Sequence, residues 1–506
     1  MAELARHVQT QVVVVGGGPV GMVVASELAG YGVDTLLVEA ATAICRRPKA
    51  TTLHARTVQC LVRRGHLEGL VSAGNRAGAA TVSTPFHFAG IPGLAISVPA
   101  TEPEPVLKCA QEELERAFER RALVAGVRIL RGHRVTEVHQ EPGGVRVTVE
   151  GPRGRLSCVA DYLVGADGAR STVREQADFS SQTYPATVSA LAGDVRLAEA
   201  GLLGQGWRRT PRGWIVAKDV PGGRLRLRTV NCAGAHAERR LPPTLEELRR
   251  EVSWIAGAEI AMDAPRWLSR FSDFSRLARS YRSGRVLLAG DAAHVHFPIG
   301  GQGLSTGLLD AVNLGWKLAL TVRGVAGGGL LDSYDEERRR AAQRVIDNTR
   351  AQVALMRPGP ELDPLRDLFG RLLAQGGESS VLSSMISAQD TVLPARSARP
   401  SPWEGRFLPN VGLTTPEGPT DVIRLLREGR PLLLLLGEQE GSGYDREARG
   451  WAGLLRVVRA AATPEIPCEA ILVRPDGYIA WAPGGDALTA ALSAYFGGAT
   501  AVTANA

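Results

Sequence analysis

The fold is decided by one stretch of sequence, VVVVGGGPVGMVVASELAGYGVDTLLVEA, which runs from Val12 to Ala40. Its first four residues form a continuous apolar run, typical of a strand buried on both faces of a parallel sheet. Gly16, Gly18 and Gly21 follow with the spacing G-x-G-x-x-G. Between a strand and a helix, these glycines allow a tight turn, close approach of the backbone to a pyrophosphate, and packing of the helix on the strand. The stretch therefore predicts a dinucleotide-binding unit.

The flanks of this turn narrow the choice of dinucleotide. We expect a helix over Pro19–Ala29, whose amino end at Pro19 and Val20 would face the pyrophosphate. Glu39 ends the next predicted strand, and its carboxylate, beside Ala40, can accept hydrogen bonds from ribose hydroxyls. A carboxylate at this place disfavours a ribose 2′-phosphate, so FAD or NAD would fit and NADP would not. The choice between FAD and NAD stays open at this point.

The composition favours a globular protein that binds neither membranes nor nucleic acid. The 506 residues are 44% hydrophobic and 22% charged, which is ordinary for two to four soluble domains. No apolar run reaches the roughly eighteen residues of a membrane span, and no cleavable hydrophobic segment starts the chain, so we expect a cytoplasmic protein. The net charge of +7 comes mostly from arginine without a dense basic block, and the lysines are Lys49, Lys108, Lys218 and Lys317. This pattern argues against nucleic acid as a partner.

The cysteines and histidines predict no metal site. The six cysteines are scattered without a C-x-x-C pair, so we expect neither a zinc site nor a disulfide framework. His294 and His296 have His-x-His spacing, but no third ligand accompanies them.

Two later segments bear on the choice between FAD and NAD, and the first is ADYLVGADGARSTVR, residues 160–174. It predicts an apolar strand, a tight turn at Asp167 and Gly168, and a helix from about Ser171. A dehydrogenase that binds NAD would not need this segment.

The second segment, GRVLLAGDAAHVHFPIGGQGLSTGLLDAVNLGWKLAL, spans residues 284–320. It predicts a strand that ends at Gly290 and Asp291, a loop, and a long helix that begins near Gly303. Asp291 can accept a hydrogen bond from a ribityl hydroxyl, a group that NAD lacks. The loop from Pro298 to Gly303 would bring N–H groups and the positive helix end to the pyrimidine edge of a flavin, where negative charge accumulates on reduction. The three segments together favour FAD.

In order and spacing, these segments resemble the three fingerprints of single-component FAD-dependent aromatic hydroxylases, the class A flavoprotein monooxygenases. The sequence is most similar to the aromatic polyketide hydroxylases of actinobacteria, of the angucycline and anthracycline type, and more loosely similar to rifampicin monooxygenases. Arg47–Ala50 with Leu53–Thr57, Asp310–Lys317 and Arg474–Trp481 support the resemblance. The likeness covers essentially the whole chain and is weakest over Gln176–Arg279, where substrate is expected to bind.

The resemblance implies a set of cofactor-binding residues beyond the glycine turn and Glu39. Arg46 or Arg47 and Gln111 are expected near the phosphates and the ribityl chain, and Val135 is expected to touch the adenine through its backbone. The Asp167–Gly168 turn is associated with both FAD and NADPH. The residues expected along the flavin are Gly290, Asp291, Pro298, Gly301, Gly303 and Leu304. One departure is Ser305, where many relatives have asparagine.

The resemblance also implies an α/β architecture of three units. An FAD-binding domain, a Rossmann variant like that of glutathione reductase, would comprise residues 1–80, 106–178 and 280–395. A β-sheet substrate domain would comprise residues 81–105 and 179–279, and a thioredoxin-like domain residues 404–506. Within them we expect strands over 128–138, 145–149 and 224–230 and a helix over 112–125. Cys468 is the only cysteine of the last unit, which excludes dithiol chemistry there and favours a role in structure or association.

The reaction implied by the resemblance is carried by the cofactor, so no catalytic side chain is assigned. NADPH or NADH would reduce the flavin, and O2 would then give a flavin C4a-hydroperoxide that hydroxylates a polycyclic aromatic polyketide in antibiotic-type secondary metabolism. The expected substrate contacts are His54, Arg56, Phe86, Trp207, Trp214 and Phe297.

Two alternatives to aromatic hydroxylation stay open. One is a Baeyer–Villiger or ring-rearranging oxygenation on the same scaffold. The other is a flavin-binding reductase or regulatory protein without oxygenase activity. The sequence also leaves open which substrate is used, which nicotinamide cofactor serves as reductant, and whether the protein is a monomer or a homodimer.

Overall fold

The largest sheet is built on β1 (Arg6–Val15), so the strand predicted from the valine run is confirmed. β1 pairs in parallel with β10 (Gly154–Gly165) on one side and with β2 (Thr35–Glu39) on the other. The order continues to β19 (Val286–Leu288) and β18 (Arg282–Ser283) beyond β10, and to β7 (Arg128–Arg131) beyond β2. The computed structural model describes residues 6–71, 81–199, 201–236, 241–375, 379–437 and 443–499. The predicted domain ends within residues 72–80 and 500–506 lie outside these ranges.

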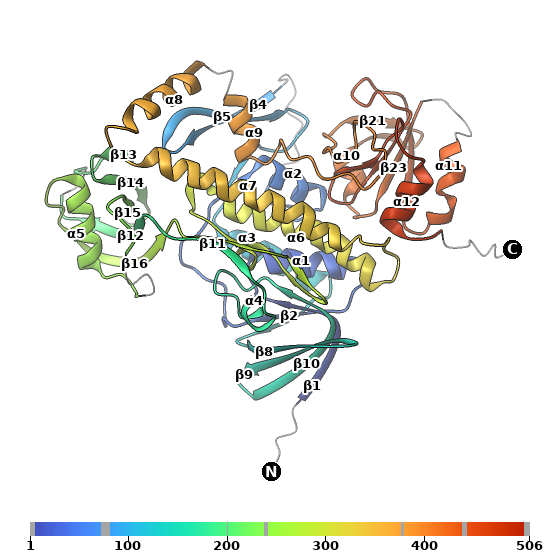
Figure 1. The fold of residues 1–506 in the computed structure, drawn as a ribbon, viewed down its shortest axis with the longest axis horizontal. Coiled ribbons are helices and arrows are strands. Elements are labelled where there is room, and N and C mark those ends of the chain that lie inside the picture. The colour runs from blue at the N-terminus through green and yellow to red at the C-terminus, as the bar shows by residue number, and fades with distance from the viewer. Residues whose placement is uncertain are drawn as a thin grey trace, which may run out of the picture.

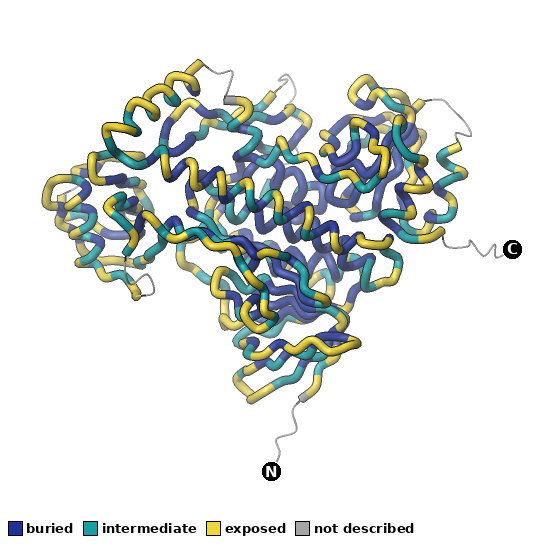
Figure 2. The backbone as a smooth tube through the Cα atoms, in the orientation of Figure 1, coloured by how far each residue is buried: buried dark blue, intermediate teal, exposed yellow. Residues whose placement is uncertain are grey.

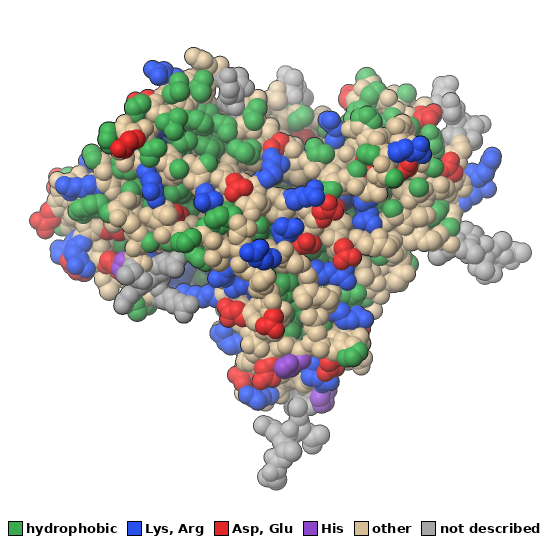
Figure 3. Space-filling view, viewed as in Figure 1, with side chains coloured by type: hydrophobic (Ala, Val, Ile, Leu, Met, Phe, Trp, Pro, Cys, Tyr) green, Lys and Arg blue, Asp and Glu red, His purple; other side chains and the backbone are tan. Residues whose placement is uncertain are grey.

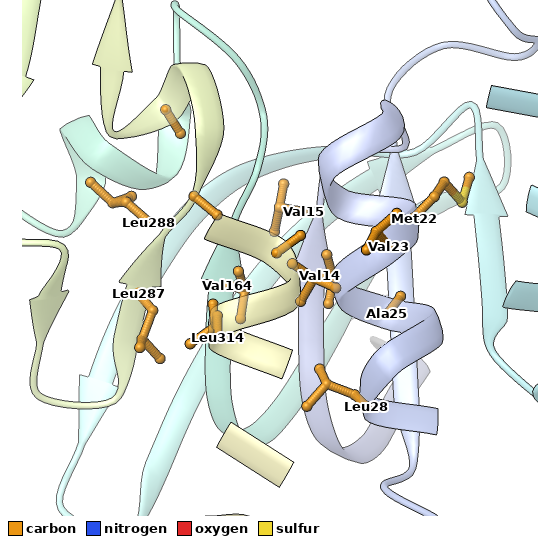
Figure 4. Packing of buried hydrophobic residues seen from close by; sticks show 14 of the residues in the cluster. Val14, Val15, Met22, Val23, Ala25, Leu28, Val164, Leu287, Leu288 and Leu314 are labelled. Carbon is orange, nitrogen blue, oxygen red and sulfur yellow. The ribbon is translucent and has the colours of Figure 1, made fainter. Parts of the chain in front are cut away.

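Two helices, α1 (Pro19–Gly30) and α6 (Gln302–Val322), pack on this sheet and on each other. Figure 4 shows Val23 of α1 beside Val14 of β1, and Leu314 of α6 beside Val164 of β10. The close approach of the two helices requires glycine at position 315, because a Cβ there would lie 2.4 Å from the Cβ of Glu27. Helix α3 (Gln111–Val124) packs against α1 and confirms the helix predicted there.

The continuous strand predicted over residues 128–138 is wrong in one respect, because the chain turns at Gly132. Gly132 has φ +68, in the left-handed region that favours glycine. Before it, β7 pairs in parallel with β2. After it, β8 (Arg134–Glu141) pairs instead with β9 (Gly144–Gly151), which is antiparallel to β10. The apolar pattern continued through the turn, although the pairing partner changed.

A second sheet has five antiparallel strands in the order β13-β14-β15-β12-β16. Its strands are β12 (Ser189–Leu197), β13 (Gly206–Thr210), β14 (Gly213–Val220), β15 (Arg224–Asn231) and β16 (Met262–Ser272). Helix α5 (Leu245–Ala256) covers one face through Leu248 and Val252, which pack on Ile215 and Leu227. The opposite face carries Trp214, which belongs to an apolar cluster with Phe297 and Met356. The alternating strand predicted over 224–230 is confirmed as β15.

A hairpin of β4 (Thr81–Phe88) and β5 (Ile91–Pro99) forms a sheet of its own rather than joining the five-stranded sheet. It packs against α8 (Asp363–Gln375) and α9 (Ser379–Ile386), which follow the long helix α7 (Asp332–Met356). In Figure 1, α7 crosses the molecule between the lobe of the five-stranded sheet and the C-terminal lobe.

The C-terminal unit contains a four-stranded sheet in the order β24-β23-β25-β26. β23 (Leu432–Leu436) is entirely buried, and it lies parallel to β24 but antiparallel to β25. The remaining elements of the unit are β21 (Gly412–Thr415), β22 (Gly418–Asp421), α10 (Val422–Leu426), α11 (Gly443–Ala448), β24 (Arg456–Ala460), β25 (Ala470–Val473), β26 (Ile479–Trp481) and α12 (Leu488–Phe496).

Short elements join these units and lie near their junctions. They are β3 (Thr52–His54), α2 (Ala55–Arg63), β6 (Val106–Lys108), α4 (Thr172–Gln176), β11 (Ser181–Tyr184), β17 (Ser275–Ala278) and β20 (His294–Val295). Figure 2 shows that buried backbone is concentrated where the central sheet meets α1 and α6.

The visible surface mixes charges of both signs, as Figure 3 shows. On α8, Leu365, Leu368 and Leu372 are exposed. None of the helices in the described ranges has the length and apolar character needed to cross a membrane.

Candidate cofactor and substrate site

The glycine turn between β1 and α1 has no room for side chains at two of its three glycines. Gly16 has φ +109, and a Cβ there would lie 2.3 Å from the backbone oxygen of Ala166. A Cβ at Gly21 would lie 2.0 Å from the oxygen of Gly16. At Gly18, by contrast, a Cβ would meet no atom within 4 Å. The turn is therefore closed on its protein side and open on the side where a pyrophosphate would lie.

A second turn, at the end of β19, is brought against the first by α1 and α6. Val20 of α1 lies close to both Gly290 and Gly307, where an added Cβ would come 3.1 Å and 2.8 Å from its Cγ2. The backbone N–H of Gly290 donates to Oδ2 of Asp310 in α6 at 3.0 Å. Thus the first and third sequence segments, about 270 residues apart in sequence, form one surface.

Asp310 fixes this arrangement from the inside of the molecule. Its Oδ2 also lies 2.8 Å from Nε2 of His294, and its Oδ1 accepts from Nε of Arg338 at 2.8 Å. Burial would raise the pKa of Asp310, but Arg338 and His294 outweigh it and lower the pKa. His294, the first residue of β20, is therefore a structural partner of Asp310.

Two helices begin at this surface without a side-chain cap. The N-cap residues are Gly18 for α1 and Gly301 for α6, and neither provides a capping hydrogen bond. Gly300 and Gly301 have φ +71 and +66, a conformation that favours glycine and lets the loop turn into α6. The first N–H groups of each helix are left for a ligand, and the helix dipoles favour negative charge there.

The two predicted acids next to the turns have local partners. Glu39 accepts hydrogen bonds from the N–H groups of Gly17 at 2.5 Å and Ala41 at 2.6 Å, which holds its carboxylate at the open side of the turn. Asp167 accepts from Oγ of Ser171 at 2.5 Å and from the N–H of Val173 at 3.1 Å. Burial raises the pKa of Asp167 despite these hydrogen bonds. In this structure Asp167 organises the start of α4.

Asp291 differs from these acids, because no hydrogen bond or salt bridge to its carboxylate is found within the described ranges. It lies in the turn that begins two residues after β19 and is exposed, although the protein atoms around it raise its pKa. An acid left without a partner beside two uncapped helices fits a ligand that carries hydroxyl donors between phosphates and a ring. The residues present therefore fit FAD.

The other predicted cofactor residues lie around this surface. Arg46 and Arg47 are exposed, and Nε of Arg46 lies 4.0 Å from Glu112. Gln111 begins α3, where its Oε1 accepts from the N–H of Ala50 at 3.4 Å. Val135 is buried in β8. Of the residues that line the start of α6, Pro298 is exposed and Gly303 and Leu304 are half-buried.

Ser305 occupies the position where many relatives have asparagine, and its hydroxyl has a structural partner. Its Oγ accepts a hydrogen bond from the N–H of His54 at 3.1 Å. The ring of His54 lies with Nε2 2.7 Å from the backbone oxygen of Gly300. Burial lowers the pKa of His54 to about 4, so the ring is neutral near pH 7. These contacts tie β3 to the loop before α6.

Three of the six predicted substrate residues form a row of rings beside this loop. Phe86 lies edge-on to His54, with ring centroids 5.2 Å apart. His87, which we did not predict, stacks on Phe86 at 4.9 Å and approaches Trp207 at 4.8 Å. Trp207 is 38% exposed. The row therefore runs from the buried His54 through the partly buried Phe86 and His87 to the exposed Trp207.

The other three predicted substrate residues make contacts within the protein. Arg56 lies with its guanidinium 3.6 Å from the ring centroid of Phe407 and donates to the backbone oxygen of Gln389 at 3.0 Å. Trp214 is buried and donates to the oxygen of Met356 at 2.7 Å. Phe297 is buried against Phe271. We therefore omit Arg56, Trp214 and Phe297 from the substrate contacts proposed below.

Segments 310–317 and 474–481, which support the family resemblance, meet in a buried charge cluster that was not predicted from the sequence. Arg474 donates to both oxygens of Glu337, at 2.9 and 2.8 Å, and to Asp476 at 2.9 and 2.6 Å. Nζ of Lys317 lies 2.8 Å from Oε2 of Glu337. Asn313 donates to Glu337 at 2.7 Å and to Asp476 at 3.2 Å. The cluster joins α6 and α7 to the C-terminal unit.

The fold and the site together define a dinucleotide-binding α/β protein whose turns fit FAD. Comparison with known proteins gives the family. Residues 9–349 match the family described as FAD binding domain, and residues 401–499 match the family described as aromatic-ring hydroxylase, C-terminal. The chain belongs to this family of FAD-binding monooxygenases, and the predicted resemblance is confirmed.

Two curated relatives and one solved structure are similar over nearly the full length. The 12-dehydrotetracycline 5-monooxygenase/anhydrotetracycline 6-monooxygenase of Streptomyces rimosus is 38% identical, over 96% of this chain and 98% of the relative. The dialkyldecalin synthase of Streptomyces rugosporus is 37% identical, over 96% and 98%. The structure of an aromatic hydroxylase from angucycline biosynthesis aligns with a TM-score of 0.87 at 35% identity, over 97% and 99%.

Proposed function

We propose that this protein is an FAD-dependent, NAD(P)H-driven monooxygenase that hydroxylates a polycyclic aromatic polyketide in antibiotic-type secondary metabolism. One observation carries the proposal: the uncapped start of α6, with its left-handed glycines, lies beside the unpartnered Asp291 and close to the row of rings that includes Phe86 and Trp207. The full-length likeness to named monooxygenases supports it.

Each part of this surface has a task in the proposed reaction. The Gly16–Gly21 turn and the start of α1 would hold the pyrophosphate, Glu39 the ribose and Asp291 the ribityl chain. The N–H groups at the start of α6 would stabilise negative charge on the reduced ring. When bound and reduced, the flavin supplies the activation of O2. The aromatic row would position the substrate ring and exclude water.

The C-terminal unit supports the arrangement rather than the chemistry in this proposal. Its strand order, with β23 parallel to β24 and antiparallel to β25, supports the thioredoxin-like fold predicted from the sequence. Cys468 is half-buried and burial raises its pKa, which disfavours a reactive thiolate. The domain limits, the cytoplasmic location and the choice between monomer and homodimer stay predictions.

A second candidate function is a reaction without oxygen insertion. The specific observation behind it is the dialkyldecalin synthase, a relative not named as an oxygenase that is nearly as similar as the tetracycline monooxygenase. Likeness at this level therefore does not fix the reaction type.

The decisive experiment is turnover under ¹⁸O2. The purified holoenzyme is supplied with NADPH or NADH and a panel of polycyclic phenolic polyketides, and the products are examined by mass spectrometry. Hydroxylation predicts one ¹⁸O atom on a ring carbon. One ¹⁸O atom in a new ester or lactone would indicate a Baeyer–Villiger reaction, and a product without label would contradict oxygenase function. A protein that takes up no FAD would contradict the proposal at its first step.

A further inference from the structure

A lysine that the mechanism does not use lies at the edge of the aromatic row. Lys108 ends β6, and its Nζ lies 5.4 Å from the ring centroid of Phe86 and donates to Oγ1 of Thr52 at 2.9 Å. Thr52 packs against the start of α6, because a Cβ at Gly301 would lie 3.2 Å from the Thr52 Cβ. Lys108 thus places a positive charge between the loop that would hold the flavin and the rings that would hold the substrate.

The surroundings of Lys108 contain cations and neutral rings. Burial lowers the pKa of Lys108, and the charge of Lys218 lowers it further. His87 is neutral near pH 7, because burial, helped by the charge of Lys108, lowers its pKa to about 4. His54 is neutral for the same reasons. Within the described ranges, no carboxylate forms a salt bridge with Lys108 or Lys218.

The face of the five-stranded sheet opposite α5 adds a third cation. Side chains alternate along β14, so Lys218 lies on the same face as Trp214. On β15, Arg228 pairs with Val216 and therefore also lies on this face. Arg228 is exposed and forms no salt bridge with a described residue. The nearby acid, Asp194, already has both oxygens bound by Arg226, at 2.7 and 2.9 Å.

All three cations are exposed, so water solvates them in the free protein. Like charges near one another still repel, and an anion bound between them would relieve that repulsion. Two buried cations of the described chain have carboxylate partners, Arg474 with Glu337 and Arg338 with Asp310. Lysine is also scarce, with four residues in 506, and the charge of one of them, Lys218, lowers the pKa of another, Lys108. A negatively charged ligand oxygen would supply the missing partner.

We propose that Lys108, assisted by Lys218 and Arg228, recognises an ionised phenolic or enolic oxygen on a flat aromatic substrate that stacks along Phe86, His87 and Trp207. Lys108 is thus a positioning and specificity residue: it selects substrates that carry an acidic hydroxyl and turns that edge toward the start of α6. This inference rests on the proposed function, because it names what the same site binds. No bond is made or broken in this step.

The test uses the FAD-loaded protein and alizarin, a flat three-ring dye whose ionised hydroxyl absorbs at longer wavelength than the flavin. In the wild-type protein we expect bound alizarin to ionise at a pH about 1 unit or more below that of the free dye. In Lys108→Met the apparent pKa of the bound dye rises by about 1 unit, and the dissociation constant near neutral pH rises about tenfold. Lys108→Arg retains the wild-type behaviour, because the charge remains.

Three controls separate recognition from other effects. Arg155→Met removes one exposed positive charge in the β9–β10 hairpin and should leave dye binding unchanged. The dimethoxy analogue of alizarin, which cannot ionise, should bind wild-type and Lys108→Met equally. Anthraquinone-2-carboxylate tests whether a carboxylate can replace the phenolate, and equal dependence on Lys108 for both anions would contradict selection of an acidic hydroxyl. Flavin absorbance per chain verifies that each variant is folded, and Lys218→Met gives an independent, smaller shift in the same direction.

An unchanged apparent pKa of alizarin in Lys108→Met would overturn the inference, and so would an equal loss of affinity for the dimethoxy analogue. Weaker binding of NADPH with unchanged dye binding would assign the cations to the reductant's phosphate instead, which also overturns it. The ¹⁸O2 experiment tests the proposed function independently of this inference. If the product carries no ¹⁸O but ionisation of the bound dye still depends on Lys108, the oxygenase proposal is wrong and the proposed recognition by Lys108 stands.

Discussion

Two groups of cations in this protein have opposite surroundings. At the junction of α6, α7 and the C-terminal unit, Arg474 and Lys317 are buried and contact Glu337, and Arg474 also contacts Asp476. On the substrate side, Lys108 lies 5.4 Å from the Phe86 ring, the charge of Lys218 lowers the pKa of Lys108, and no described carboxylate forms a salt bridge with either lysine. The first group is complete within the chain. The second would be completed by a ligand.

The difference teaches which charges maintain the fold and which serve the site. A buried ion pair is strongly destabilised when one partner is removed, because the remaining charge has neither water nor a counterion. An accessible cation without a protein partner adds little to stability, since water still solvates it. Stability and binding measurements on the same variants should therefore separate the two groups.

The largest expected effect on stability comes from removing Arg474 from the buried cluster with Glu337 and Asp476. Arg474→Ala leaves Glu337 and Asp476 buried without their main partner, and we expect the free energy of unfolding to fall by about 3–5 kcal/mol. Denaturant unfolding followed by circular dichroism measures this. As a control, Arg340→Ala removes an exposed pair with Glu336 on α7 and should cost less than about 1 kcal/mol. Equal losses in the two variants would contradict the comparison.

Glu27, with Arg64 and His66, forms a second buried group whose charges are paired, and we expect its contribution to stability to be lost at low pH. Burial would raise the pKa of Glu27, but Arg64, with His66, outweighs it and lowers the pKa from 4.5 to about 2. A carboxyl whose pKa is lower in the folded state stabilises above its unfolded pKa, and this stability is lost as the pH falls toward the folded value.

We therefore expect Glu27 to contribute about 3 kcal/mol that disappears between pH 4.5 and 2. Urea unfolding of wild-type and Glu27→Gln across this range measures it. The gap between the two proteins should narrow as the pH falls. A gap that stays constant would show that the ionisation of Glu27 does not stabilise the fold.

The glycine turn also contains one position needed for the fold, Gly21, and one expected to face the ligand, Gly18. A Cβ at Gly21 would overlap the oxygen of Gly16, whereas one at Gly18 would meet open space. Gly21→Ala should destabilise the protein without FAD by about 1–3 kcal/mol. Gly18→Ala should leave that stability within about 0.5 kcal/mol but raise the dissociation constant for FAD about tenfold, or about 1.4 kcal/mol. Flavin fluorescence titration and apoprotein unfolding measure both, and unchanged FAD affinity in Gly18→Ala would place the pyrophosphate elsewhere.

The smallest expected effect on stability comes from removing a cation that has no carboxylate partner. Lys108→Met should change the free energy of unfolding by no more than about 0.5 kcal/mol, because no described acid loses a partner. The same denaturant titration as for Arg474→Ala measures it. A loss of several kcal/mol would mean that Lys108 belongs to the structural group, and its role in recognition would then need another explanation.

The sequence predicted the fold well where local patterns decide it. Helices α1 and α6 were predicted to within two residues at each end, and the valine run gave the second part of β1, which begins six residues earlier, at Arg6. It failed at Gly132, because the same apolar alternation continues while the strand changes its partner from β2 to β9. The predicted FAD contacts of the site stay predictions, although Asp291 and the start of α6 lie where they were expected.

The substrate side was predicted less well, since aromatic residues serve cores as often as sites. Phe86 and Trp207 lie in the row of rings, whereas Trp214 and Phe297 are packed in the interior. His87 and Lys108 were missed. The scarcity of lysine was the only signal that could have drawn attention to Lys108.

The sequence by itself determined the dinucleotide-binding fold and the FAD-binding family, because tight turns and close backbone contacts require glycine at fixed spacings that can be seen along the chain. Only the tertiary structure decided which charges have partners. Arg474 finds Glu337 from 137 residues away, and Lys108 finds no acid among the described residues. Charge pairing depends on distance in space and on burial, and neither is encoded in a short stretch of sequence.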